Sequence, residues 1–233
     1  MKRIGLIGGV SPEATILYYR HLNAAARQKH GGQHSANVLY YMLDYGVMIH
    51  HYHNNNWPDF IAEVVKGAEP LKAGGAEALA ITSGTTHVAA AAVAEATGLP
   101  VIHMHDSLTR AMQEKAVRQP LLIGTPWVMS GDFFQPELAK RYDGQIITPS
   151  TEDRDMIGNI IFDELVEGIV KPESRADMAA MVGRYQVEGA DGVILGCTEL
   201  CMILEQADCT IPVLDATAIH ASDIAKVMLG AQR

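Results

Sequence analysis

Long apolar runs and concentrated positive charge are both missing from this sequence. Of its 233 residues 48% are apolar and 19% charged, and no run reaches the ~18 uncharged apolar residues that a membrane span needs. Eighteen lysines and arginines face 27 acidic residues, which gives a formal net charge of −9. Because no apolar run is long enough, we expect no membrane span. Because phosphate binding requires clustered lysine and arginine, we expect no binding to nucleic acid.

Cysteine is also scarce. The three cysteines are Cys197, Cys201 and Cys209, and an odd number in one short stretch does not form a disulfide framework. A chain of this length buries roughly 70% of its unfolded surface, so it needs no disulfide or metal to fold. The first residues suit a strand and a loop better than a signal peptide. Reduced thiols and cytoplasmic residence are the expectation.

Apolar runs typical of buried strands alternate with stretches of helical character. Alternation of this kind predicts an α/β fold with parallel sheets covered on both faces. Helices are best supported at Asp59–Lys72, Thr86–Thr97, Asp155–Gly168 and Glu173–Glu188. The expected strands are Ile4–Ile7, Ala36–Leu43, Ala78–Ile81, Val101–His103, Pro120–Ile123, Gln145–Thr148, Gly192–Leu195 and Pro212–Leu214.

An internal repeat organises the chain. The segment from Gly75 to Ser83 matches the segment from Gly189 to Cys197 without a gap, and two further pairs of segments match at nearly the same spacing. The repeat predicts two similar Rossmann-like α/β domains related by duplication, with the active site in the cleft between them. We expect the first domain to comprise residues 1–98 plus 210–233, and the second to comprise residues 99–209.

Ser83 and Cys197 occupy equivalent positions of this repeat, each where an apolar strand gives way to small hydroxylic residues. The start of a helix after a strand offers free backbone N–H groups to an anion, so both places can bind a carboxylate. A free cysteine is commonly a small buried filler, and we expect this role for Cys201 and Cys209. The repeat favours a functional site at Cys197.

Three motifs resemble those of the aspartate/glutamate racemase family. The segment GGVSPEAT (Gly8–Thr15) resembles the amino-terminal signature, and LGCTE (Leu195–Glu199) resembles the second cysteine motif. The segment TSGTTH (Thr82–His87) lies where the family has its first cysteine motif, Cys-Asn-Thr-Ala-His. The match extends from residue 4 to about residue 220. It implies two similar α/β domains with the catalytic pair facing each other across their interface.

The resemblance implies a cofactor-independent amino-acid racemase in which Cys197 exchanges the α-proton on one face of the substrate. Ser83 replaces the first family cysteine, as threonine does in a branch that acts asymmetrically on L-substrates. A thiol with a pKa near ~8.5, lowered further at a helix start, can serve as the base, whereas an alcohol is far poorer. We therefore expect Ser83 to donate or relay a proton on the opposite face.

Six candidate substrate-binding residues follow from the same motifs, and capping of helices is an equally good role for several of them. Tyr52 lies where the family's loop reaches the distal group of the substrate, and Thr125 matches Gly9 in the internal repeat. His87 can orient Ser83 or be purely structural, and Glu199 can fix Cys197, bind the substrate ammonium or stabilise a helix start. The candidates are Val10, Ser11, Tyr52, Gly84, Thr85, Thr125, Thr198 and Glu199.

No metal or cofactor is expected. His50, His51 and His53 lack ligand spacing, as do His103 and His105. The glycines of the first strand are not in the order of a dinucleotide fingerprint, and no lysine stands in a recognisable pyridoxal setting. The arginine and lysine with which many family members bind an acidic side chain are not evident. Their absence weighs against aspartate and glutamate but leaves the chemistry at the α-carbon intact. The expected substrate is a small-molecule amino acid, either Asp/Glu-like or otherwise polar.

Two alternatives stay open. Relatives with only the second cysteine decarboxylate malonates and use that cysteine to protonate the carbanion, and Ser83 with Gly84 fits such a one-thiol lyase. A non-catalytic amino-acid-binding protein of the same fold would bind its ligand without α-proton exchange. A homodimer is expected from the family likeness alone.

Overall fold

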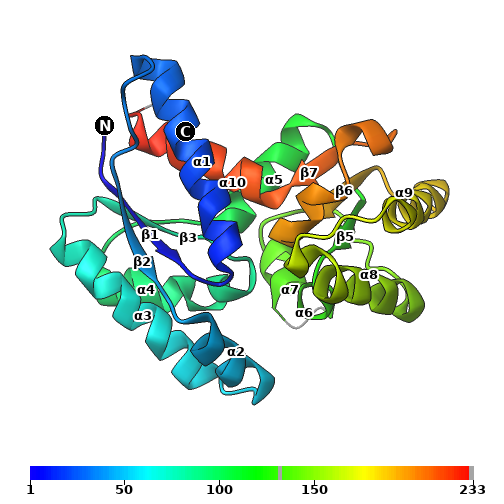
Figure 1. Ribbon diagram of the computed structural model, residues 1–233, viewed down its shortest axis with the longest axis horizontal. Coiled ribbons are helices and arrows are strands. Elements are labelled where there is room, and N and C mark those ends of the chain that lie inside the picture. The colour runs from blue at the N-terminus through cyan, green and yellow to red at the C-terminus, as the bar shows by residue number, and fades with distance from the viewer. Residues whose placement is uncertain (131–132, 231–233) are drawn as a thin grey trace. The chain divides into compact units, whose positions relative to one another are not determined.

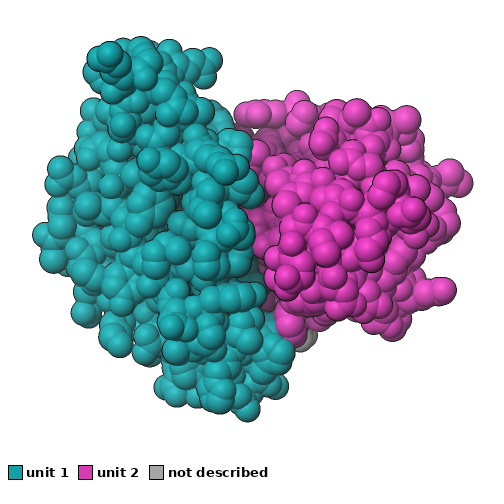
Figure 2. All heavy atoms as spheres, viewed as in Figure 1, with its two compact units in different colours: residues 1–104, 220–233 teal, residues 105–219 magenta. Residues whose placement is uncertain are grey.

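Two compact units make up the molecule. The computed structural model describes residues 1–130 and 133–230. Unit 1 comprises Met1–Met104 and His220–Arg233, and unit 2 comprises His105–Ile219, as Figure 2 shows by colour. Each unit contains its own parallel sheet. The fold is therefore α/β, as the alternation of strands and helices predicted.

Unit 1 is built on strands β1 (Ile4–Gly8), β2 (Val38–Met42), β3 (Ala78–Ile81) and β4 (Val101–Ile102), which pair in the order β2-β1-β3-β4. Every pairing in this sheet is parallel. The helical segments that belong wholly to this unit are α1 (Pro12–His30), α2 (Tyr45–His53), α3 (Trp57–Ala73), η1 (Thr85–Ala89) and α4 (Ala90–Thr97).

Helices cover both faces of this sheet (Figure 1). Helix α1 and the last helix, α10 (Ala216–Met228), share one apolar core with the side chains of β1 and β3. On the opposite face, α3 approaches β2 so closely that a Cβ on Gly67 would lie 2.6 Å from the Tyr41 ring. Burial on both faces explains why the strands are near-continuous apolar runs.

Unit 2 is built on strands β5 (Pro120–Ile123), β6 (Gly192–Leu195) and β7 (Val213–Asp215), which pair in parallel in the order β5-β6-β7. Helices α8 (Thr151–Asp163) and α9 (Pro172–Val187) cover one face, where Leu121 and Val193 join their core. The helical segments are α5 (Met104–Glu114), α6 (Pro126–Met129), α7 (Phe134–Ala139), α8 (Thr151–Asp163), η2 (Leu165–Glu167), α9 (Pro172–Val187), η3 (Thr198–Met202) and η4 (Gln206–Asp208).

The repeat seen in the sequence reappears in the two sheets. The order β1-β3-β4 in unit 1 corresponds to β5-β6-β7 in unit 2. Ile7 pairs with Ile81 in the first sheet, as Ile123 pairs with Leu195 in the second. Ser83 and Cys197 each lie two residues beyond the last paired residue of the corresponding strand, β3 or β6. They therefore occupy equivalent positions at the carboxyl edges of their own sheets.

The predicted domain boundaries differ from the observed ones. The units divide after Met104 and after Ile219, and not after residues 98 and 209. The reason is strand pairing, because β4 pairs with β3 and so belongs to unit 1, whereas β7 pairs with β6 and so belongs to unit 2. Only the residues from His220 onward return to unit 1.

Some predicted elements are shorter or divided. The run Gln145–Thr148 forms a single bridge between Ile147 and Leu121, because it lies between Gly144 and Pro149, which weaken and end a strand. The predicted helix 86–97 divides into η1 and α4. The predicted helix 155–168 begins earlier, at Thr151 after the cap residue Ser150, and ends at Asp163. No helix in the described part of the chain is long and apolar enough to cross a membrane.

Candidate active site

The loop after β1 is fixed by a glycine and a helix cap. Gly9 has a φ of +98°, and a Cβ there would lie 2.2 Å from the backbone oxygen of Leu43, so a side chain would be excluded on both counts. Ser11 caps α1, since its hydroxyl accepts a hydrogen bond from the backbone N–H of Ala14 at 3.4 Å. The candidate residues Val10 and Ser11 are thereby held at the carboxyl edge of the sheet in unit 1.

Two buried threonines join this loop to the end of β3. The Thr15 hydroxyl accepts a hydrogen bond from the Gly9 N–H at 3.0 Å and lies 3.2 Å from the Thr82 hydroxyl. The Thr82 hydroxyl also lies 3.4 Å from the Ile7 carbonyl, to which it can donate. Sequence reasoning missed both roles, although Thr15 and Thr82 lie inside the quoted motifs. The pair places the first motif directly beside Ser83.

Ser83, Gly84 and Thr85 are partly exposed where β3 ends. The element that follows is the short 3₁₀ helix η1, and not the start of a long α-helix. Thr86 is buried, and its hydroxyl has no hydrogen-bond partner among the residues that the structure describes. A buried hydroxyl without a partner is costly, so a ligand that bonded to it would stabilise this turn.

Cys197 in unit 2 donates a hydrogen bond through its thiol to Oε2 of Glu199 at 2.9 Å. The Thr198 hydroxyl donates to the same oxygen at 2.7 Å. Burial, and then the negative charge of Glu199, raise the pKa of the Cys197 thiol well above its usual range. The expectation of a lowered pKa was therefore wrong, because the sulfur is buried and a carboxylate lies against it.

The other two cysteines lie on the same side of unit 2 but make different contacts. The Cys201 thiol donates to the carbonyl of Thr198 at 3.0 Å, and burial followed by the charge of Asp215 raises its pKa to about 11. Burial likewise raises the pKa of Cys209. Both side chains pack against the apolar core of this unit. A packing role for Cys201 and Cys209 stays a prediction.

Thr125 lies beside the Cys197 segment within unit 2. It follows β5, which pairs with β6, and the Gly196 N–H donates to the Ile123 carbonyl at 2.8 Å. The Thr125 hydroxyl is buried and has no hydrogen-bond partner in the described ranges 1–130 and 133–230. Thr125, Thr198 and Cys197 therefore lie at one edge of the sheet in unit 2. Their role in substrate binding stays a prediction.

Tyr52 and the histidines around it lie on α2 in unit 1. Tyr52 is 6% exposed, and its ring meets that of Trp57 edge-on at 5.4 Å. His50, His51 and His53 share this helix, in which successive side chains point about 100° apart. Among the residues described, no group of three histidine, cysteine, aspartate or glutamate side chains could hold a metal ion.

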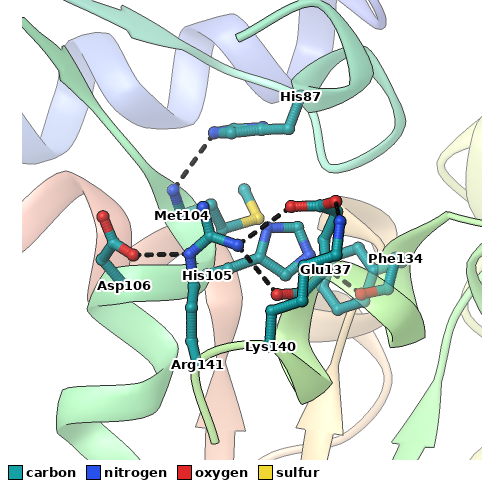
Figure 3. Close-up of polar contacts among 8 residues, drawn as sticks. All are labelled: His87, Met104, His105, Asp106, Phe134, Glu137, Lys140 and Arg141. Carbon is teal, nitrogen blue, oxygen red and sulfur yellow. Dashed lines mark hydrogen bonds and ion pairs between the residues drawn. The ribbon is translucent and has the colours of Figure 1, made fainter. Parts of the chain in front are cut away.

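His103 and His105 have separate surroundings. The His103 ring lies 4.7 Å from that of His87 in a T-shaped contact. His105 is completely buried, and its Nε2 donates to the carbonyl of Phe134 at 3.1 Å, as Figure 3 shows. The next residue, Asp106, forms an ion pair with Arg141 at 2.7 Å.

Solved structures resemble this chain over almost its whole length. A candidate Asp/Glu racemase from Yersinia pestis is 33% identical, with a TM-score of 0.93 over 98% of this chain and 100% of the other. The protein PH1733 of Pyrococcus horikoshii OT3, an aspartate racemase homologue, is 27% identical, with a TM-score of 0.88 over the same shares. An unliganded arylmalonate decarboxylase is 17% identical, with a TM-score of 0.55 over 100% and 95%, which shows only a shared fold.

Sequence comparison points the same way. The broad specificity amino-acid racemase RacX of Bacillus subtilis (strain 168) is 20% identical in an alignment 234 residues long that covers 98% of this chain and 99% of that protein. The sequence model of the Asp/Glu/Hydantoin racemase family matches residues 7–224, a range that includes Gly8–Thr15, Ser83 and Cys197. The chain belongs to the Asp/Glu/Hydantoin racemase family.

Proposed function

We propose that this protein is an amino-acid racemase that works without pyridoxal phosphate and exchanges the α-proton through Cys197 and Ser83. The observation that carries the proposal is the pairing of the Cys197 thiol with Glu199 at the end of β6. Ser83 lies at the equivalent end of β3 in a protein of a racemase family. Racemisation requires one proton-transfer group for each face of the α-carbon, and these two residues supply them.

Glu199 gives Cys197 both protonation states that the reaction needs. At rest the thiol is protonated, because burial and the adjacent carboxylate raise its pKa, so it is ready to donate a proton to a carbanion. To act as a base it passes its proton to Glu199, and the thiolate then removes the α-proton. The electron pair of the Cα–H bond stays on the carbanion, which the substrate carboxylate delocalises.

Ser83 serves the opposite face of the carbanion. Its hydroxyl donates a proton to Cα and regains one from water, and the proton that Glu199 took from Cys197 neutralises the hydroxide left behind, which completes inversion without a second thiol. An alcohol is a weak acid and its conjugate base forms with difficulty, so transfer at this face is slow compared with transfer at Cys197. The proposed enzyme is therefore asymmetric in rate. Its equilibrium ratio of enantiomers is still one, since a catalyst does not change an equilibrium.

Hydroxyl groups are the proposed ligands of the α-carboxylate. Thr125 carries a buried hydroxyl without a partner among the described residues, and a carboxylate oxygen would satisfy it. Gly84, Thr85 and Thr198 can add backbone or hydroxyl donors, and Val10, Ser11 and Tyr52 can bound the side-chain end. We propose a polar amino acid as substrate, with aspartate and glutamate as the first to test.

The test is incubation in D₂O with separate pools of L- and D-amino acids and no added cofactor. Mass spectrometry reports which acquire α-deuterium, and chiral chromatography reports inversion. The expected result is exchange and inversion for a polar amino acid, unaffected by phenylhydrazine, which traps pyridoxal. Release of CO₂ from an arylmalonate without exchange would instead establish the one-thiol lyase. Ligand binding without either reaction would establish a non-catalytic binding protein.

We also propose cytoplasmic residence and a homodimer. Three free thiols suit a reducing compartment. The dimer rests on the family likeness alone, and light scattering after gel filtration tests it, with a mass of one chain as the contradicting result.

A further inference from the structure

His87 makes two hydrogen bonds that connect separate parts of unit 1. It lies in η1, four residues after Ser83, and is 2% exposed. Its Nδ1 lies 2.7 Å from the backbone carbonyl oxygen of Ser83. Its Nε2 lies 3.1 Å from the backbone nitrogen of Met104, a contact drawn in Figure 3. One imidazole thus joins the end of β3 to the segment that follows β4.

These two partners define the protonation state of the ring. A backbone N–H can only donate, so Nε2 of His87 is the acceptor and carries no proton. A backbone carbonyl can only accept, so Nδ1 carries the proton and donates it to Ser83. His87 is therefore a neutral imidazole in the Nδ1–H form, and both of its nitrogens are used.

Ser83 is consequently held from both sides through the backbone. On one side, the preceding residue Thr82 is fixed by the Thr15 hydroxyl and the Ile7 carbonyl. On the other side, His87 holds the carbonyl of Ser83 itself. The backbone of a residue sets the direction of its Cα–Cβ bond, so both contacts decide where the side chain of Ser83 leaves the chain.

The groups that face His87 are also aromatic. Its ring meets those of His103 at 4.7 Å and His220 at 5.4 Å. His220 is completely buried, with Nε2 at 2.8 Å from the Ile102 carbonyl and Nδ1 at 2.9 Å from the Tyr18 hydroxyl. Because a carbonyl only accepts, His220 carries its proton on Nε2, the opposite tautomer to His87. This packing fixes the plane of the His87 ring.

We propose that His87 is a positioning residue that holds the Ser83 turn, through its Nδ1–H, in the orientation needed for proton transfer at Ser83. The proposal rests on the proposed racemase function. A purely structural role would require only that the His87 ring fill space, whereas the proposed role requires its hydrogen bond to the Ser83 carbonyl. Misplacement of a reacting group by about 1 Å can cost roughly 10²-fold in rate.

Two substitutions separate the two bonds of the ring. In His87→Asn the amide nitrogen takes the place of Nδ1 and keeps a donor for Ser83, while the bond to Met104 is lost. In His87→Gln the amide oxygen reaches the place of Nε2 and keeps an acceptor for Met104, while the donor to Ser83 is lost. Thr97→Val is the matched control, since it removes a buried 2.6 Å hydrogen bond of the same unit, to the Val93 carbonyl, away from Ser83.

The readouts are inversion, which needs both proton-transfer groups, and α-deuterium exchange with retention, which needs only Cys197. We expect His87→Gln to lower kcat for inversion roughly 10- to 100-fold, with KM and Cys197-side exchange within about threefold of the wild type. His87→Asn should keep inversion within about fivefold. Thr97→Val should lower the melting temperature and change neither rate by more than about twofold.

Several results would overturn the proposal. Equal loss of both rates in His87→Gln, no loss in His87→Gln, or an Asn variant as damaged as the Gln variant would each assign His87 a structural role. Failure of the wild type to exchange any α-proton would refute the proposed function first, before any variant is made. If the Gln variant does not fold, ¹⁵N NMR of the wild-type histidines still tests the proposal. An Nε2–H tautomer at His87 would contradict the proposed hydrogen bond from Nδ1 to the Ser83 carbonyl.

Discussion

Units 1 and 2 hold their candidate catalytic residues in different ways. Ser83 in unit 1 is fixed through its backbone, by the carbonyl bond to His87 and by the neighbouring Thr15–Thr82 pair. Cys197 in unit 2 is fixed through its own side chain, by the thiol bond to Glu199. The two sheets therefore carry their candidate residues at equivalent strand ends, while the groups that hold these residues differ.

This difference indicates a division of labour. A side-chain partner such as Glu199 changes the acidity of the group that it touches, as the raised pKa of Cys197 shows. A backbone partner such as His87 changes only the direction of the side chain. We infer that unit 2 supplies the titrating group and that unit 1 supplies an oriented hydroxyl.

The largest expected effect comes from removing the thiol. Cys197→Ala should lower α-proton exchange roughly 10²- to 10⁴-fold for both enantiomers, because the main acid and base is lost. Exchange in D₂O measures it. Cys201→Ala and Cys209→Ala are the controls and should stay within about threefold. Equal losses in all three variants would mean that the cysteines act by packing.

Restoring a thiol in unit 1 should remove the asymmetry between the units. Ser83→Cys should raise the slow direction of exchange roughly tenfold, since a thiol is the better acid and base, and leave the fast direction nearly unchanged. Ser83→Ala should abolish inversion while exchange at Cys197 persists. If Ser83→Cys has no effect and Ser83→Ala is harmless, Ser83 is outside the proton path and the one-thiol lyase gains support.

The sequence predicted the buried strands well. Ala78–Ile81, Pro120–Ile123 and Gly192–Leu195 have the predicted bounds, because a strand buried on both faces must be an uninterrupted apolar run. The internal repeat also placed Ser83 and Cys197 at equivalent strand ends. These features depend on local composition, which a sequence displays directly.

Features that depend on tertiary partners were not predictable. The pKa of Cys197 has the opposite direction to the one expected, because it is decided by burial and by where the Glu199 side chain turns. The unit boundaries follow strand pairing, such as β7 with β6, and not the composition of the segments between. The tautomer of His87 depends on Met104, which is brought to it only by the sheet.

The two units also differ in the polar groups that join their helices. In unit 1, the Tyr18 hydroxyl lies 2.9 Å from His220 Nδ1 and joins α1 to α10. In unit 2, α8 and α9 are joined by Asp153, which accepts from the Tyr185 hydroxyl at 2.8 Å and pairs with Arg184. Burial raises the pKa of Asp153, but these hydrogen bonds outweigh burial and lower the pKa. The stabilisation is present above the unfolded-state pKa and is lost as pH falls through the lower folded-state pKa.

Asp153→Asn should therefore reduce the free energy of unfolding by about 1–3 kcal/mol at neutral pH, and the deficit should shrink in strong acid. Urea unfolding at a series of pH values measures it. Asp155→Asn is the matched control, because Asp155 is exposed on the same helix. A deficit for Asp153→Asn that does not change with pH would show that its packing matters and its charge does not.

The smallest expected effect concerns the charge beside Cys197. In the wild type the thiol should react slowly with iodoacetamide at pH 8, because a raised pKa leaves little thiolate. Glu199→Gln removes the negative charge and should lower the pKa, so alkylation of Cys197 should become faster. The gain should be only about three- to tenfold, since burial is the larger cause of the raised pKa and is unchanged. Mass spectrometry of each cysteine measures the rate of alkylation.

Glu205→Gln is the control, because Glu205 contributes to the raised pKa of Cys201 and should speed alkylation only at that cysteine. Slower or unchanged alkylation of Cys197 in Glu199→Gln would mean that the charge of Glu199 does not suppress the thiolate at rest, and the raised pKa of Cys197 would then be due to burial alone.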